Sequence, residues 1–340
     1  MKQRLFVTLS LAGLAMSTFG ATKPKTAIKS LNKTTIQQPT YTEWHDLQVN
    51  AINRFPLHTN FFTYPADDWV YEKDGKIVSK DILHMNKAES KYFLSLDGTW
   101  KFNWVANADQ RPTDFYKEDL DDSKWKTMNL PGIWEMNGFG DPEYVNVGFG
   151  WRGHFDQQPP AVPTKDNHVG SYRRIIDIPA NWDGKQVVAH FGSVTSNIYL
   201  YVNGKFAGYA EDSKVAAEFD ITPYLKKGKN LIAFQTFRWC DGSWDEDQDF
   251  WRLSGVARES YLFARDAQLH LEDIRVTPDL VNNYKDGVLN ISTKVKGTGK
   301  LNFILFDKEG KQVATATGLA KNGTANITMN VENPHKWNAE

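Results

Sequence analysis

The sequence has a single cysteine, almost no net charge and no long apolar run after its first residues. Because Cys240 is the only cysteine among 340 residues, no disulfide can form within the chain. The 40 basic and 41 acidic residues nearly cancel, and no basic stripe is present, so nothing indicates nucleic-acid binding. Beyond its start the chain has no run of the roughly 20 apolar residues that a membrane span requires. We therefore expect no membrane span and a fold that relies on core burial.

The first twenty residues have the pattern of a secretory signal peptide. Lys2 and Arg4 form a charged start, Leu5–Met16 is apolar, and the triplet Thr18–Gly20 offers a small-residue cleavage site. The apolar run is too short to cross a bilayer. We therefore expect export, with periplasmic and secreted destinations both open. Residues 21–40 are polar and lack periodicity, which predicts a flexible arm.

Helical periodicity is scarce after residue 40, whereas short runs of β-branched and aromatic residues recur between turn residues. Asn203-Gly204 is typical of a two-residue hairpin turn, which requires positive φ. This pattern favours an antiparallel β-sandwich. The strands predicted before residue 266 are Tyr172–Ile178, Val187–Phe191, Asn197–Val202, Lys205–Ala210, Asn230–Arg238 and Tyr261–Ala264.

A second block of strands begins near Ala267 and resembles an immunoglobulin-like sandwich. That fold normally takes about 100 residues and seven strands, whereas only about 70 residues are present here. We therefore expect the chain to be the front portion of a longer protein. The five predicted strands are Leu269–Val276, Gly287–Val295, Lys300–Phe306, Gln312–Ala316 and Ala325–Val331.

The segment Arg238–Gly255 reads RWCDGSWDEDQDFWRLSG and mixes four aromatic residues with five carboxylates and two arginines. Sugars present apolar C–H faces to aromatic rings and hydroxyls to carboxylates, so this composition suits a sugar ligand. It equally suits a loop held together by tryptophan packing and Arg–Asp pairs, and the residues alone leave both interpretations open. We expect Arg252 and Arg258 to hold the loop by pairing with Asp247 or Asp249.

Several segments together resemble glycoside hydrolase family 2, from about Tyr41 to Glu340. The short motif WHDLQVNAINR at Trp44–Arg54 is similar to the entry motif of the large β-galactosidases, which favours this branch over β-glucuronidases and β-mannosidases. The other segments are FLSLDGTWKFNW at Phe93–Trp104, LPGIWEMNGFGDPEYVNV at Leu130–Val147, PPAVPTKDNHVGSYRR at Pro159–Arg174, FDITPY at Phe219–Tyr224 and the acidic–aromatic segment at Arg238–Gly255.

This resemblance implies an all-β N-terminal portion of a multidomain exo-glycosidase. It implies a jelly-roll sugar-binding domain at residues 41–266, a truncated immunoglobulin-like domain at 267–340, and a (β/α)8 barrel that this chain lacks. In the family two barrel glutamates perform retaining chemistry, which needs carboxyl groups about 5–5.5 Å apart. We therefore expect no catalytic residue in this chain and no activity from it alone. Neither Glu143 nor Glu246 is assigned that role.

Two residues correspond to binding residues of the family. Asn146 matches the asparagine that reaches into the galactose pocket, and Asp241 matches the aspartate that binds a sodium ion and a sugar hydroxyl. An amide can donate to and accept from hydroxyls, and a carboxylate is a hard oxygen ligand. On residue type alone, loop and turn roles are as good an explanation. Cys240 stands where the family often has serine. The resemblance also implies a divalent cation, magnesium or calcium, in the missing barrel.

The implied activity is hydrolysis of terminal β-galactosides, such as lactose or galactose-terminated glycans. Three other interpretations stay open: a non-catalytic carbohydrate-binding module, a scaffold for the barrel, and another family 2 glycosidase such as a β-glucuronidase. Association into a homo-oligomer is also left open.

Overall fold

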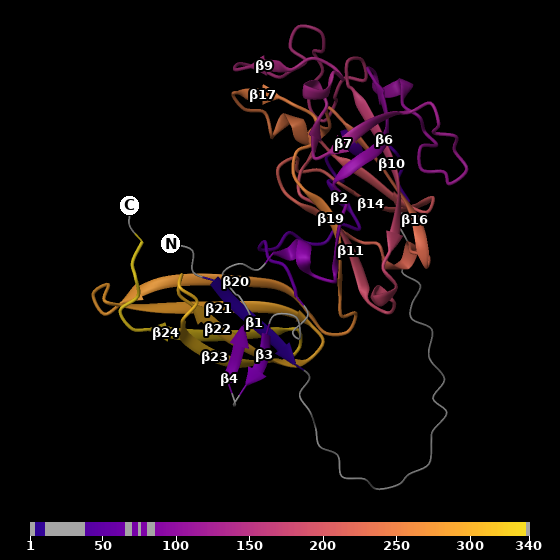
Figure 1. Cartoon of the computed structure of the whole chain (residues 1–340). Helices are drawn as coiled ribbons and strands as arrows, with labels where there is room; N and C mark the ends of the chain where they lie inside the picture. The colour runs from indigo at the N-terminus through magenta and orange to yellow at the C-terminus, as the bar shows by residue number, and fades with distance from the viewer. Residues whose placement is uncertain (1–3, 11–37, 65–69, 74–75, 80–85, 338–340) are drawn as a thin grey trace. The chain divides into compact units, whose positions relative to one another are not determined.

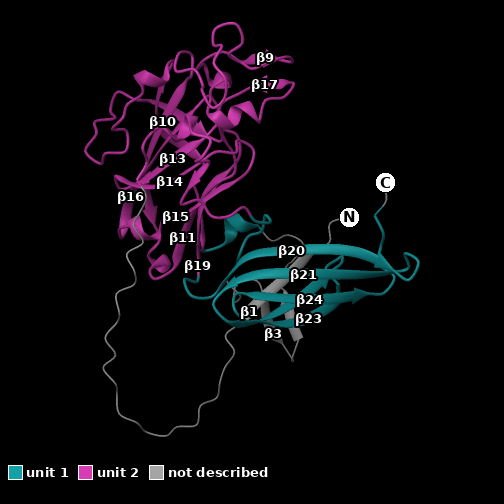
Figure 2. Ribbon diagram, turned by 180° about the vertical axis from the view of Figure 1, so that it is seen from behind, with its two compact units in different colours: residues 1–35, 58–91, 266–340 teal, residues 36–57, 92–265 magenta. Residues whose placement is uncertain are grey.

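The computed structural model describes residues 4–10, 38–64, 70–73, 76–79 and 86–337, which form two compact units (Figure 1). Unit 1 is drawn from residues 1–35, 58–91 and 266–340, and unit 2 from residues 36–57 and 92–265 (Figure 2). Apart from short 3-10 turns, every regular element in these described residues is a β-strand, which confirms the predicted all-β class. The described ranges include no helix that is both long and apolar enough to cross a membrane.

Unit 2 is a sandwich of two main antiparallel sheets. The larger has the strand order β2-β14-β13-β16-β10-β6-β7 and the smaller has the order β15-β11-β19-β5. The bounds in the larger sheet are β2 Ala51–Ile52, β6 Gly98–Val105, β7 Lys126–Leu130, β10 Val169–Ile178, β13 Ile198–Val202, β14 Lys205–Ala210 and β16 Gly228–Phe237. Those in the smaller sheet are β5 Phe93–Ser95, β11 Gln186–Phe191, β15 Ala217–Asp220 and β19 Ser260–Arg265.

Shorter elements of unit 2 lie outside these two sheets. Two small sheets have the orders β12-β18-β8 and β17-β9. Their bounds are β8 Gly132–Ile133, β9 Glu143–Val145, β12 Val194–Thr195, β17 Phe250–Arg252 and β18 Gly255–Val256. The 3-10 helices of unit 2 are η1 Glu43–His45, η3 Ala108–Gln110, η4 Glu135–Asn137, η5 Ala180–Trp182, η6 Thr222–Tyr224 and η7 Asp241–Trp244.

Strand β13 is buried on both faces because two separate clusters pack against the larger sheet. Its residues Ile198, Leu200 and Val202 belong to the cluster that both sheets share, which is the core of the sandwich. The alternate residues Tyr199 and Tyr201 belong to a second cluster on the opposite face. Since successive strand side chains point to opposite faces, one strand serves both clusters. The second cluster covers a sheet face that would otherwise be exposed.

The strands predicted in unit 2 are confirmed, with ends that differ by at most two residues except at β10, which begins three residues earlier than predicted. The hairpin turn between β13 and β14 is also confirmed, since Asn203 and Gly204 both have positive φ, 49° and 75°. Central pairing of the larger sheet runs from Val169 opposite Phe237 to Ile178 opposite Gly228. This long register fixes where β16 ends, and the acidic–aromatic segment starts at that point.

Unit 1 contains two three-stranded sheets, with orders β20-β21-β24 and β1-β22-β23, and a separate β3-β4 hairpin. A cluster of buried apolar residues, including Ile291, Phe303 and Met329, forms its core. All five strands predicted after residue 266 are present. The bounds are β1 Arg4–Ser10, β3 Val70–Lys73, β4 Lys76–Ser79, β20 His270–Val281, β21 Asp286–Lys296, β22 Gly299–Phe306, β23 Gln312–Ala320 and β24 Thr324–Val331, with the 3-10 helix η2 at Lys87–Glu89.

The predicted signal peptide falls largely outside the described residues. Of residues 1–20, only 4–10 are described, as strand β1, which pairs antiparallel with β22 from Arg4 opposite Phe306 to Ser10 opposite Lys300. The predicted arm at 21–40 lies outside the described residues up to residue 37. Export therefore stays a prediction.

Candidate functional site

The second aromatic cluster forms the base of the candidate site. Strands β13 and β14 contribute Tyr199, Tyr201 and Tyr209 to it. Two loop tryptophans pack there as well, with the ring of Trp151 standing edge-on to Trp239 at a centroid distance of 5.4 Å. Aromatic pairs of this kind add to the free energy gained from their buried area. The loops that carry the candidate residues are thus held by buried rings.

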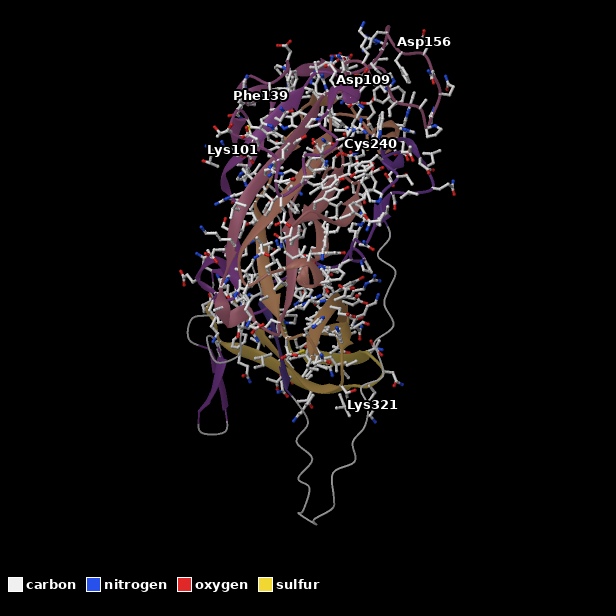
Figure 3. All side chains as sticks on the ribbon, turned by 90° about the vertical axis from the view of Figure 1, so that its right-hand side faces the viewer. Lys101, Asp109, Phe139, Asp156, Cys240 and Lys321 are labelled. Carbon is white, nitrogen blue, oxygen red and sulfur yellow. The ribbon has the colours of Figure 1, made fainter. Side chains whose placement is uncertain are left out.

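The acidic–aromatic segment begins where β16 ends, and buried hydrogen bonds fix its backbone. The Trp239 amide donates to Asn167 Oδ1 at 2.9 Å, and Asn167 Nδ2 donates to the Trp239 carbonyl at 3.0 Å. The Cys240 amide donates to Ser243 Oγ at 3.1 Å, which closes the turn that starts η7. Cys240 is buried among closely packed side chains of unit 2 (Figure 3). This arrangement gives Asp241, the first residue of η7, a defined position.

Asp241 lies in a buried group with Glu211 and Cys240. One potential ligand atom from each residue lies within 4.8 Å of the other two. Glu211 directly follows β14 and accepts a hydrogen bond from the Tyr209 hydroxyl at 2.5 Å. Burial raises the pKa of Glu211 to about 8 and also raises the pKa of Asp241. Two carboxyl groups this close are stabilised by a shared proton or by a cation.

The donor set in this group fits a hard cation. Carboxylate oxygens of Asp241 and Glu211 are ligands that alkali and alkaline-earth ions prefer. The thiol does not suit such an ion, because burial raises the pKa of Cys240 well above its usual value. Its sulfur already contacts the Ser196 carbonyl at 3.7 Å. A hard cation would therefore be held by the two carboxyl groups and not by the thiol.

Asn146 lies at the end of a two-stranded ribbon. Strand β9 pairs antiparallel with β17, which belongs to the acidic–aromatic segment, and Tyr144 stands opposite Trp251. Asn146 follows β9 directly, and its side chain is exposed. Within the described residues neither a hydrogen bond nor an ion pair joins Asn146 to Asp241. The ribbon thus connects Asn146 to the same segment as Asp241, and within the described residues no hydrogen bond joins the two side chains.

The arginines of this region behave differently from one another. Arg252 forms an ion pair with Asp247, as predicted. The prediction for Arg258 was wrong, because its Nη1 donates to the Lys214 carbonyl at 2.6 Å instead of pairing with a carboxylate of the loop. Part of this acidic segment therefore does hold the loop together, in agreement with the structural interpretation of its composition.

The two glutamates that were not assigned a catalytic role both have structural partners. Glu143 forms an ion pair with the buried guanidinium of Arg238 at 2.9 Å. Glu246 accepts a hydrogen bond from the Ser213 amide at 2.8 Å. In the described part of the chain these two residues fix loops. Sequence reasoning did not identify Glu211 as an acid of this site. The only sign of it in the sequence is that this glutamate directly follows the apolar end of a strand.

Comparison with protein families identifies the architecture around this site. Residues 93–266 match the sugar binding domain of glycosyl hydrolases family 2, and residues 269–340 match a second family model described as glycosyl hydrolases family 2. The chain belongs to glycosyl hydrolase family 2. Its sandwich is the sugar-binding domain of the family, and the strands after residue 266 belong to the immunoglobulin-like domain.

Several curated relatives of this family 2 chain are β-galactosidases or β-galactosidase large subunits by name. A β-galactosidase of Priestia megaterium is 35% identical over 313 residues, which cover 88% of this chain and 29% of the relative. A β-galactosidase of Halalkalibacterium halodurans is 36% identical over 87% of this chain and 28% of its own length. The β-galactosidase large subunit of Leuconostoc lactis is 30% identical, with 87% and 46% covered. The chain thus spans less than half the length of these relatives.

Solved structures show the same fold at lower sequence identity. A β-glucuronidase of Bifidobacterium dentium superposes with a TM-score of 0.57 at 17% identity and covers 75% of this chain and 44% of its own. A β-glycosidase of Bacteroides vulgatus has a TM-score of 0.55 at 22% identity, with 72% and 30% covered. At such identities the superpositions establish the fold of the family 2 domains alone.

A buried glutamate beside this site gives a testable pH dependence. Glu135 Oε2 accepts from the Ser254 amide at 2.9 Å, and Oε1 has no hydrogen-bond partner in the described residues. Burial raises the pKa of Glu135. Above about pH 4.3, the Glu135 carboxyl of the unfolded chain is ionised, whereas the folded chain still holds its proton until the pH passes the raised pKa. The free energy of unfolding therefore falls as pH rises through the pKa of the folded state. Glu135→Gln keeps the acceptor without a charge to bury.

We expect Glu135→Gln to leave the urea midpoint at pH 4 unchanged and to raise it at pH 7.5. The gain at pH 7.5 should be about 1 kcal/mol, the usual size for an uncompensated buried polar group. The measurement is urea unfolding of the wild-type and variant chains at both pH values. Equal midpoints at pH 7.5 would show that the wild-type carboxylate is stabilised by groups other than those described.

Proposed function

We propose that the chain is the N-terminal part of an exported retaining β-galactosidase that hydrolyses terminal non-reducing β-D-galactosyl residues. The observation that carries this proposal is the set of relatives named β-galactosidase, with identities of 30–36% over 77–88% of this chain. The β-glucuronidases among the structural neighbours are less similar in sequence and speak only for the fold. The β-galactosidase branch is therefore favoured over the β-glucuronidase branch.

In this proposal the complete protein continues into a barrel that carries the catalytic glutamates and a magnesium or calcium ion. Retaining hydrolysis needs one carboxylate that attacks the anomeric carbon and one carboxylic acid that protonates the leaving oxygen, about 5–5.5 Å apart. Two acids of unit 2 that could be considered, Glu143 and Glu246, are already engaged in an ion pair and a hydrogen bond. This portion supplies binding and scaffold residues.

The binding residues in this proposal are Asn146 and Asp241. The exposed amide of Asn146 can donate to and accept from sugar hydroxyls. Asp241 would bind a sugar hydroxyl and, together with the neighbouring carboxyl of Glu211, a sodium ion. A bound sodium ion would add positive charge beside the sugar oxygen and keep both carboxyl groups ionised.

The proposal is tested by hydrolysis of a chromogenic β-galactoside by the complete gene product, beside the matching β-glucuronide and β-mannoside. We expect cleavage of the galactoside alone. Cleavage of the glucuronide instead would keep the family and replace the branch. If none of the three is cleaved, the second candidate gains support, a carbohydrate-binding module without catalysis, which the sugar-binding family match of residues 93–266 favours.

A further inference from the structure

The direction of the Asn146 side chain depends on the backbone that carries it. Its exposed amide makes no hydrogen bond within the described residues, so no polar partner of its own holds it in place. The strands β9 and β17 form a sheet of only two strands and lie side by side (Figure 1). A two-stranded ribbon by itself is only marginally stable in water. The position of Asn146 therefore depends on the side chains that hold the end of this ribbon.

Two arginines hold the backbone carbonyls on either side of Asn146. Arg252 Nη2 donates to the Val145 carbonyl at 3.3 Å, and Arg152 Nη1 donates to the Val147 carbonyl at 2.6 Å. Because both neighbouring carbonyls accept a hydrogen bond, rotation of the peptide groups around Asn146 is restricted. The amide then leaves the ribbon in a defined direction.

Arg252 is the more firmly held of the two arginines. It is only 5% exposed and forms an ion pair with Asp247, whereas Arg152 is exposed. Its Nη1 donates to the carbonyls of Gln248 at 2.6 Å and Phe250 at 3.0 Å. A guanidinium is planar and presents its donors in a fixed arrangement. The Arg252 side chain thus ties the end of β9 to the segment that contains β17.

We propose that Arg252 is a positioning residue for Asn146, because its bond to the Val145 carbonyl fixes the direction in which the Asn146 amide meets a sugar hydroxyl. Arg152 supports the same position from the other side of Asn146. Arg252 itself does not touch the sugar in this proposal. A small displacement of a binding group is costly in catalysis. The effect on hydrolysis rests on the proposed function, whereas the dependence of the ribbon on Arg252 rests on these contacts alone.

The test is a double-mutant cycle of Arg252→Lys and Asn146→Ala in the complete protein. Lysine keeps the positive charge of Arg252 but lacks its planar set of donors. We expect Arg252→Lys to lower kcat/KM for a β-galactoside about tenfold. In the Asn146→Ala background the same change should cost less than about twofold, because an amide that is absent cannot be misplaced. Equal losses in the two backgrounds would overturn the positioning role.

Arg173→Lys is the matched control, because Arg173 has the same chemistry away from the ribbon. It is 4% exposed, forms an ion pair with Asp122 at 2.8 Å and donates to the carbonyls of Phe115 and Lys117. We expect this variant to keep the wild-type kcat/KM. A tenfold loss here as well would mean that Arg252→Lys acts through general destabilisation, and the proposal would be overturned.

Arg152→Ala repeats the cycle at an exposed position, where the fold should survive even if Arg252→Lys does not fold. Only one hydrogen bond to the Val147 carbonyl is lost, so kcat/KM should fall about threefold. In the Asn146→Ala background we expect no further loss. A loss of the same size in both backgrounds would count against positioning through the backbone of Asn146.

Amide hydrogen exchange tests the ribbon without relying on activity. In the complete protein, Arg252→Lys should speed exchange at residues 143–148 about tenfold and leave residues 241–244 unchanged. Arg173→Lys should leave both stretches unchanged. Wild-type exchange rates at 143–148 in Arg252→Lys would overturn the proposal. If the complete protein cleaves no galactoside, the proposed function is refuted, and exchange alone then decides whether Arg252 holds the ribbon.

Discussion

Asp241→Asn in the complete protein is expected to lower kcat/KM for a β-galactoside by about 10- to 100-fold. The substitution keeps the shape of a side chain that is only 3% exposed, so the fold around η7 should survive. In the proposed site it would remove a hydrogen bond between a sugar hydroxyl and a charged acceptor, a contribution of about 1.5–3 kcal/mol. It also removes one of the two carboxylates that would hold sodium. Steady-state kinetics in sodium buffer provides the measurement.

The sodium dependence separates a binding role of Asp241 from a structural one. Replacing sodium by a large organic cation should raise KM of the wild type and have little further effect on the variant. Asp245→Asn is the control, since Asp245 caps the other end of η7 and is exposed. Asn146→Ala should also lower kcat/KM without changing the sodium dependence. Near-normal turnover in both Asp241→Asn and Asn146→Ala would refute the assignment of the site.

The strands of both units could be predicted because their signals are local. Asn203-Gly204 requires positive φ at both positions, and the runs on either side of it have strand composition. The two-faced burial of β13 could be suspected from its unbroken apolar and aromatic run, Ile198–Val202. What the run could not indicate is that loops far along the chain, including the one that carries Trp151, cover its second face.

The partners of Asp241 could not be predicted from spacing. Glu211 lies thirty positions earlier in the chain, and it meets Asp241 only because β14 and β16 both flank β13 in the larger sheet. Likewise, the sequence shows that Arg252 has acids nearby, but not which arginine pairs with a carboxylate and which with a carbonyl. Such choices depend on loop conformations, and those follow from packing across the sheet face.

Truncation of a core ring should have the largest effect on stability. Phe234 is fully buried in β16, its ring stacks on Tyr172 at 4.3 Å, and it lies edge-on to Trp100 and Phe191 at 5.3 Å each. Phe234→Ala removes these contacts and leaves a cavity between the two sheets. We expect a loss of about 3–5 kcal/mol of unfolding free energy in unit 2. Urea unfolding followed by tryptophan fluorescence is suitable, because ten of the twelve tryptophans lie in unit 2.

Ile175→Ala provides the matched control for this truncation. Ile175 lies on the neighbouring strand β10, but its side chain is 57% exposed, so its loss should cost less than about 1 kcal/mol. Comparable losses in the two variants would mean that the described core does not carry the stability of the sandwich. A large loss in Phe234→Ala alone would show that the described core carries the stability of the sandwich. Because β16 leads directly from Phe234 into the segment that contains Asp241, this core also supports the candidate site.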